Sequence, residues 1–177
     1  GGDNMDLALA HLVAQKLRDA GKELDRWQTV ALTHGCRAAK ERLLGDPKLA
    51  SAPIALASRG SSLFGSALRS ELTQEEVTRV LVDGFFPVVP ASARPATRAR
   101  VGLTQIGLPY AADPAVTKHL AAFLTRQARA GARHGSLLHP SAVLFNGGVV
   151  KGDALRARLL DALTRWLEED GAPPPRV

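Results

Sequence analysis

The chain has 177 residues, 45% of them hydrophobic, with 23 Lys and Arg against 17 Asp and Glu, and a single Cys. No apolar run approaches the ~18 residues that would predict a membrane span. One Cys and no Cys/His cluster of zinc-ligand spacing exclude a disulfide scaffold and a structural zinc domain. A reducing cytoplasm fits best. The amino terminus has two early acids and no basic region or initiator Met, so we expect a fragment of a longer chain and no signal peptide.

The formal net charge of +6 lies in one part of the chain. Seven basic residues and one acid, Asp113, fall between Arg94 and Arg133, and the remaining residues are balanced. Aromatic residues make up only 5% of the sequence, so base stacking has little to work with. The pattern favours a solvated basic face over a nucleic-acid interface.

Two helices are predicted first. The first has Asp3 or Asn4 as a possible N-cap and extends as far as Gly21, with apolar residues at helical spacing: Met5, Leu9, Leu12, Val13 and Leu17. A second helix over 26–44 ends at Gly45, Asp46 and Pro47. One stripe of this helix carries Trp27, Val30, Ala31, His34 and Ala38, with Trp27 expected as a core anchor.

Short apolar runs at 53–58 and 63–70, separated by turn residues 59–62, then predict a β-hairpin. Thr73 and Glu76 have the spacing of a capping box, and Leu72 and Val77 that of its hydrophobic staple. A third helix is therefore expected from Gln74 towards Phe85. Pro87 closes it.

The Pro-rich stretch 88–113 reads as a long connection between two lobes. Asp113 as N-cap and Pro114 at the first helical position predict a helix to about Ala130. Its expected apolar stripe is Val116, Leu120, Phe123, Leu124 and Gln127. Residues 141–146 predict a strand buried on both faces of a parallel sheet, ending in Gly147-Gly148. A last helix, capped by Asp153, carries an apolar stripe of Leu155, Leu159, Leu163, Trp166 and Leu167.

The glycine pair after that strand is the most informative motif. Ligands of α/β sheets bind at the carboxyl ends of strands, where glycine lets the backbone approach closely. A nucleotide site is one interpretation and a simple chain reversal is the other, since the P-loop and Rossmann patterns are absent. No carboxylate has the pattern of a general base, and the histidines form no i, i+4 metal pair, so no catalytic or metal residue is predicted. Cys36 and Trp166 are expected in the core.

Three features in this order resemble one family. Gly1-Gly2-x-x-x-Asp6 precedes a helix, Cys36-x-x-Ala39-Lys40-x-x-Leu43 lies on the next helix, and a strand ends in Gly147-Gly148. Together with the hairpin and the Thr-capped helix, they resemble the second lobe of the nucleotide-binding domain of DnaK-type heat-shock chaperones, from Gly1 to about Trp166. The resemblance implies an α/β fold, a fragment of the actin-like ATPase fold. Subdomain IIB would span residues 1–86, the connection 87–113, and part of subdomain IIA residues 114–177.

The resemblance also implies a binding site for the adenosine of ATP or ADP. Gly2 matches a glycine beside the ribose, and Lys40 a lysine that reaches ribose and adenine. Gly147 and Gly148 match the pair under the adenosine, and Lys151 an arginine that stacks on the adenine. Three positions depart from the family: Arg37 replaces a ribose-binding glutamate, Leu44 an adenine-binding serine, and Val149 a serine after the glycines.

The resemblance implies that the fragment contributes the adenosine-binding side of the nucleotide cleft in a divergent bacterial chaperone regulated by ATP. The phosphate loops and Mg²⁺ ligands would precede Gly1 and a substrate-binding domain would follow Val177, so no ATPase activity is expected of the fragment alone. Client proteins, co-chaperones and an exchange factor would be partners of the whole protein, with no membrane partner.

Two alternatives remain. A sugar kinase or another ATPase of the actin-like superfamily would also place Gly-Gly under an adenosine. A degenerate lobe that no longer binds nucleotide, and that docks a partner through the basic connection, would explain Arg37, Leu44 and Val149.

Overall fold

The computed structural model of the chain describes residues 2–57, 67–96, 113–130 and 136–177, and of residues 129 and 130 the backbone alone. The chain divides into two units, Gly1–Val80 and Leu81–Val177, and each is described by itself. Within the described residues the regular structure is helical apart from one antiparallel pair of strands, so the fold is mixed α and β. No helix in these ranges combines the length and apolarity needed to cross a bilayer. Gly1, the predicted turn at 59–62 and most of the predicted connection lie outside the described residues.

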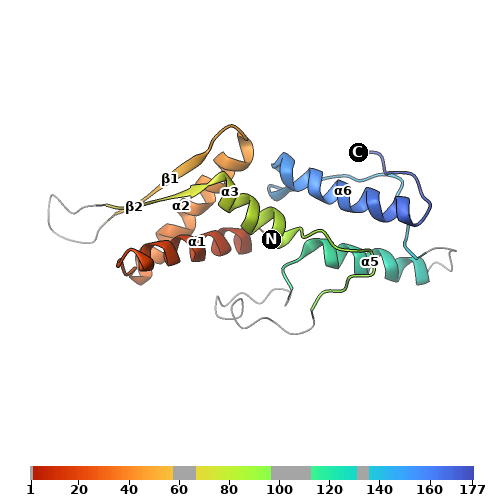
Figure 1. Cartoon of the computed structure of the whole chain (residues 1–177), viewed down its shortest axis with the longest axis horizontal. Coiled ribbons are helices and arrows are strands. Elements are labelled where there is room, and N and C mark those ends of the chain that lie inside the picture. Colours follow the sequence, from red (N-terminus) through yellow and green to blue (C-terminus); the bar gives the residue numbers. More distant parts are fainter. Residues whose placement is uncertain (1, 58–66, 97–112, 131–135) are drawn as a thin grey trace. The chain divides into compact units, whose positions relative to one another are not determined.

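Unit 1 begins with a helical hairpin, α1 (Gly2–Asp19) and α2 (Arg26–Gly45) (Figure 1). The predicted apolar face of α1 is confirmed, because Met5, Leu9, Val13 and Leu17 are buried. The predicted cap is wrong: α1 already begins at Gly2, so Asp3 and Asn4 lie in its first turn. The start of α2 is stabilised by a capping box in which Asp25 accepts a hydrogen bond from the backbone N–H of Gln28 (2.7 Å).

The predicted apolar stripe of α2 is wrong. Trp27 is 43% and Val30 55% exposed, and His34 and Ala38 are exposed as well. Trp27 is therefore not a core anchor. The buried face of the helix is instead formed by Gln28, Leu32, Cys36, Ala39, Lys40 and Leu43. Two polar side chains on this face have partners, since Gln28 Nε2 donates to the carbonyl of Ala57 and Lys40 binds Asp6.

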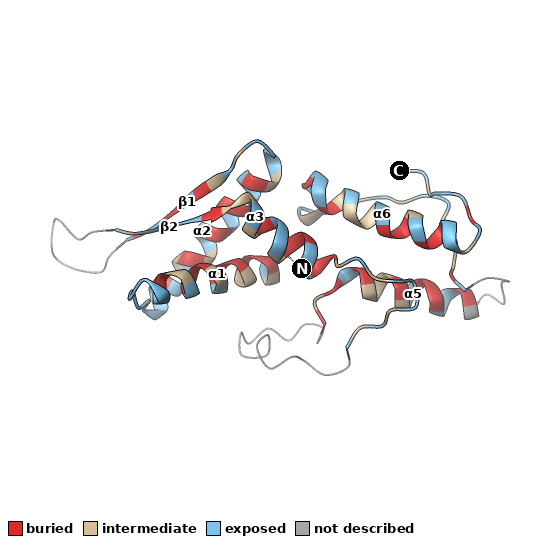
Figure 2. Ribbon diagram, viewed as in Figure 1, coloured by how far each residue is buried: buried red, intermediate tan, exposed pale blue. Residues whose placement is uncertain are grey.

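The predicted hairpin is confirmed, with shifted ends. Strand β1 (Ser51–Leu56) pairs antiparallel with β2 (Leu68–Thr73), from Ser51 opposite Thr73 to Leu56 opposite Leu68. Every second residue of β1 is buried (Figure 2): Ala52, Ile54 and Leu56. This face packs on α2, where a side chain on Gly35 would come within 3.2 Å of Ile54 Cγ2. The alternation is that of a sheet with one covered face.

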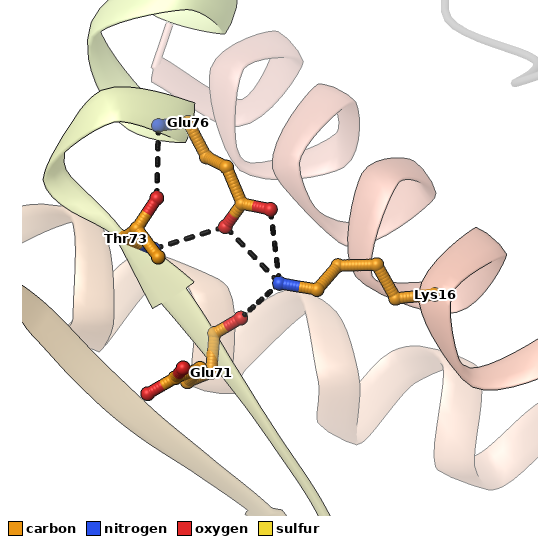
Figure 3. Close-up of polar contacts among 4 residues, drawn as sticks. All are labelled: Lys16, Glu71, Thr73 and Glu76. Carbon is orange, nitrogen blue, oxygen red and sulfur yellow. Dashed lines mark hydrogen bonds and ion pairs between the residues drawn. The ribbon is translucent and has the colours of Figure 1, made fainter. Parts of the chain in front are cut away.

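The predicted capping box follows β2 directly (Figure 3). Thr73 Oγ1 accepts from the Glu76 N–H (3.1 Å), and Glu76 Oε2 accepts from the Thr73 N–H (2.9 Å). Leu72 and Val77 are fully buried, as a staple requires. The helix continues from α3 (Gln74–Val77) into a π-helical stretch, η1 (Thr78–Asp83), and ends near Phe85 as predicted.

The same glutamate binds α1. Lys16 Nζ donates to Glu76 Oε1 (2.9 Å) and to the carbonyl oxygen of Glu71 (2.9 Å). One ammonium group thus joins α1 to β2 and to the start of α3 (Figure 3). Burial raises the pKa of Glu76, but the bonds from Thr73 and Lys16 outweigh it and lower the pKa below its ordinary value.

Unit 2 is built around α5 (Val116–Ala130) and α6 (Asp153–Glu169), which lie alongside each other (Figure 1). Trp166 is 1% exposed, which confirms it as a core anchor, and its Nε1 donates to the carbonyl of Val89 (2.8 Å). Arg158 donates to the carbonyl of Phe86 and to Asp83. These bonds attach the segment 83–89 to α6. The buried cluster comprises Ala121, Leu124, Leu137, Ala162, Leu163, Trp166, Leu167 and Ala172.

Helix α5 departs from prediction in its start and its face. It begins at Val116, not at Pro114, and Asp113 accepts from the Ala115 N–H (3.0 Å) ahead of the helix. Phe123 is 45% and Val116 37% exposed, so the predicted stripe is wrong at both. Gln127 is exposed too. The buried side chains are Thr117, Ala121, Leu124, Thr125 and Ala128.

Helix α6 follows its prediction more closely. Leu155, Leu163, Trp166 and Leu167 are buried. The predicted cap is wrong, because the N-cap position is Gly152 and makes no side-chain bond. Asp153 lies in the first turn and pairs with Arg156.

Candidate functional site

Two of the residues predicted to contact a nucleotide lie in an ionic cluster between α1 and α2. Lys40 Nζ donates to Asp6 Oδ1 (2.6 Å), and Arg37 Nε donates to Asp6 Oδ2 (2.7 Å). Arg37 Nη2 also donates to Asp3 Oδ1 (2.6 Å). We call Asp3, Asp6, Arg37 and Lys40 the α1–α2 cluster.

Burial within the cluster is graded. The side chain of Asp6 is 1% exposed and that of Lys40 10%, whereas those of Arg37 and Asp3 are 47% and 68% exposed. A buried carboxylate is tolerated only when it is paired, and here each oxygen of Asp6 accepts from one cation. The cluster carries two positive and two negative groups, and its open side is the Arg37–Asp3 pair.

The other two predicted residues of unit 1 are neighbours of the cluster. Gly2 begins α1 and precedes Asp3, so the bond from Arg37 to Asp3 holds the first turn of α1 against the middle of α2. Leu44 is four residues after Lys40 on α2, one helical turn further on, and is half-buried. The structure therefore gathers Gly2 and the basic residues of α2 within unit 1.

Asp6 was part of the motif but was not predicted as a site residue. Two basic residues three apart on the facing helix, Arg37 and Lys40, were the signal that could have identified it, because such a pair places two cations on one side of a helix. Cys36, on the buried face of α2, is fully buried as predicted. Burial, with a contribution from the charge of Asp6, raises the pKa of the Cys36 thiol to about 12, so it is not a nucleophile at neutral pH.

The glycine pair of unit 2 forms a turn. Gly147 has φ +107°, a conformation that L side chains rarely adopt, and this explains its glycine. Gly148 has φ −64°, which any residue adopts, and a Cβ there would meet nothing within 4 Å. Packing within the described residues therefore does not require glycine at 148. Val149 and Lys151 follow in a single 3-10 turn, η2 (Val149–Lys151), with Lys151 exposed.

The prediction of a strand at 141–146, buried on both faces of a parallel sheet, is wrong. The segment is extended, but its only bridge among the described residues is a parallel one, Ala142 with Arg176. The Val143 N–H donates to the Arg176 carbonyl (2.8 Å), and the Arg176 N–H to the Ser141 carbonyl (3.0 Å). Leu144 is 94% exposed, so the segment is not buried on both faces. Because the described residues supply no further neighbour, the apolar run does not form a sheet among them.

The order of elements around this bridge is nevertheless informative. The segment 141–146, a glycine turn, helix α6 and a parallel bridge at Arg176 follow one another in the order of a β-α-β unit, although the two ends share a single isolated bridge and no strand. Gly147 and Gly148 lie at the carboxyl end of the first segment, where α/β proteins bind ligands.

A further polar cluster lies at the end of α6. Asp170 accepts from Ser136 Oγ (2.7 Å), from the backbone N–H groups of Ser136 and Leu137, and its Oδ2 lies 2.7 Å from His139 Nε2. Hydrogen bonds from Ser136 and His139 hold the pKa of this carboxyl well below its ordinary range. Ser136 and His139 both bind the aspartate rather than each other, so this is not the arrangement of a nucleophile and its base. In the described ranges no three His, Cys, Asp or Glu side chains are grouped to hold a metal ion.

No protein-family model matches the sequence, and a search of curated proteins found no match either. The resemblance to a chaperone lobe therefore depends on the residues above.

Proposed function

We propose that this chain forms the adenosine-binding side of the nucleotide cleft of a DnaK-like, ATP-regulated chaperone, as a fragment of an actin-like ATPase fold. Gly2, Arg37, Lys40 and Leu44 would belong to the upper subdomain, and Gly147, Gly148, Val149 and Lys151 to the lower one. ATP or ADP is the ligand, with Mg²⁺ held by residues outside this chain, and client proteins are the partners of the whole cytoplasmic protein.

The observation that carries this proposal is the hydrogen bond between Asp6 and Lys40. Asp6 is the last residue of Gly-Gly-x-x-x-Asp, and Lys40 is the lysine of Cys-x-x-Ala-Lys. The two motifs on which the resemblance depends are 34 residues apart, yet they meet at 2.6 Å.

Unit 2 adds support of a different kind. Its glycine turn follows an extended segment and precedes a helix, and Gly148 has open space on the side where a Cβ would be. A ligand that approaches the backbone closely gives a reason for glycine at this position.

Titration of ADP into the full-length protein tests the proposal by calorimetry. Wild type should bind ADP, and Lys40→Ala should bind it markedly more weakly. Lys48→Ala is the matched control, because Lys48 is an exposed lysine of the same unit and no hydrogen bond of its ammonium group is seen among the described residues. Wild type that binds no ADP would contradict the proposal.

A second candidate is an interaction module that no longer binds nucleotide. Arg37 favours it, because this residue replaces the ribose-binding glutamate of the family and its guanidinium is paired with Asp3 and Asp6. On this alternative ADP leaves the melting temperature unchanged, whereas a nucleotide-binding protein gains stability with the logarithm of the ADP concentration once that concentration exceeds Kd.

A further inference from the structure

Asp6 has an unusual position among the charged residues of unit 1. Its carboxylate is buried with 1% exposure, and each of its two oxygens binds a different cation on α2. Removing a carboxylate from water is costly, so the pairing must be close to be stable. Both distances are short, 2.6 Å to Lys40 and 2.7 Å to Arg37.

Lys40 depends on this partner more than Arg37 does. A lysine side chain has four rotatable bonds and loses much conformational freedom when its ammonium group is held in one place. In the described residues the acceptor of Lys40 Nζ is Asp6 Oδ1, while Arg37 has a second partner in Asp3. Within the described residues, Asp6 accepts from one of the three N–H groups of Lys40.

We infer that Asp6 is a positioning residue of the adenosine site, which holds Lys40 and Arg37 in place before nucleotide binds. The inference rests on the proposed function. Asp6 itself is buried beneath the two cations and acts through them. Preorganisation of this kind raises affinity because the ligand does not have to order the side chains that bind it.

The test is a double-mutant cycle on ADP affinity in the full-length protein. Asp6→Glu keeps the charge and moves the carboxylate by one methylene, and Asp6→Asn keeps the shape and removes the charge. Each should weaken ADP binding about tenfold or more when Lys40 is present. In a Lys40→Ala background the same changes should have much smaller effects, since the cation that depends most on Asp6 is gone and Arg37 keeps its bond to Asp3.

A stability control separates positioning from folding. Lys16→Met removes a different ion pair of unit 1 and should lower the melting temperature without changing ADP affinity. Asp6→Glu serves where Asp6→Asn fails to fold. Full ADP affinity in a folded Asp6 variant, or an equal loss with and without Lys40, would overturn the inference and leave the proposed function standing. Wild type that does not bind ADP would overturn both.

Discussion

Lys16 Nζ and Glu76 Oε1 lie 2.9 Å apart, although 60 residues separate them in the chain. The glutamate also completes the capping box at Thr73, so one carboxylate stabilises the start of α3 and attaches it to α1. The ion pair thus joins the first helix of unit 1 to the end of the β-hairpin.

The first prediction concerns this ion pair. A double-mutant cycle of Lys16→Met and Glu76→Gln should give a coupling free energy of about 0.5–1 kcal/mol, because the pair is only partly exposed. Glutamine preserves the reciprocal cap at this position, so the cycle isolates the charge. Urea unfolding at low and high salt measures it. Free energies that simply add would mean that the pair contributes nothing to stability.

The second prediction concerns the cap. Thr73→Ala should lower the free energy of unfolding by about 1 kcal/mol, because the Glu76 N–H loses its acceptor. Thr73→Ser retains the hydroxyl and should stay close to wild type. Equal losses in the two variants would assign the effect to the methyl group of Thr73.

The third prediction concerns the tryptophans. Trp166→Phe should lower the free energy of unfolding by about 1–3 kcal/mol, because it leaves the partly buried Val89 carbonyl without its donor. Trp27→Phe should cost less, since Trp27 is 43% exposed. Thermal melts of both variants give the comparison. A larger loss of stability in Trp27→Phe than in Trp166→Phe would contradict the assignment of Trp166, and not Trp27, as a core anchor.

The fourth prediction is a pH dependence. Burial raises the pKa of Asp113, but bonds from the Ala96 and Ala115 N–H groups and from Lys118 outweigh it and lower the pKa to about 2. A carboxylate whose pKa is lowered by folding stabilises the native state above its unfolded pKa, here near 4, and this stability is lost as pH falls to about 2. The difference in stability between wild type and Asp113→Asn should therefore be largest above pH ~4 and shrink towards pH ~2.

Denaturation midpoints between pH ~2 and ~5 measure that difference. Other acidic groups titrate in both proteins and cancel in the comparison. A difference that stays constant with pH would contradict the bonding seen at Asp113.

The fifth prediction concerns Leu144. In the 177-residue chain, Leu144→Asp should change stability by no more than about 0.5 kcal/mol, because the side chain is 94% exposed. Leu163→Asp, in the buried cluster, should unfold unit 2. Under the proposed function, full-length protein would cover the segment, and Leu144→Asp would be costly there. Small effects in both the 177-residue chain and the full-length protein would count against a buried strand at residues 141–146.

Local patterns predicted the elements better than their faces. The capping box at Thr73, the hairpin and the stripe of α6 depend on residues close together in sequence, and all three were found. The face of α2 was not. Its burial of Lys40 depends on Asp6, 34 residues earlier, and hydrophobicity alone assigned the inner side to Trp27 and Val30.

Sequence patterns singled out Arg37, Lys40 and the glycine pair Gly147-Gly148 as candidate site residues. They did not single out Asp6, which pairs with Arg37 and Lys40. The strand at 141–146 shows the other limit. An apolar run forms a buried strand only when neighbouring strands and a covering layer are present, and here the described residues supply one bridge at Arg176.

The bond from the Ala96 N–H to Asp113 Oδ2 (2.9 Å) joins the two sides of residues 97–112. When the two ends of a loop are held together, the entropic cost of closing the loop rises only with the logarithm of its length, by about 0.6 kcal/mol for each doubling. Unit 2 should therefore tolerate the insertion of a tag or a small domain between these residues, as long as Ala96 and Asp113 stay bonded. Asp113, just ahead of α5, thus also makes the position a practical attachment point for labels.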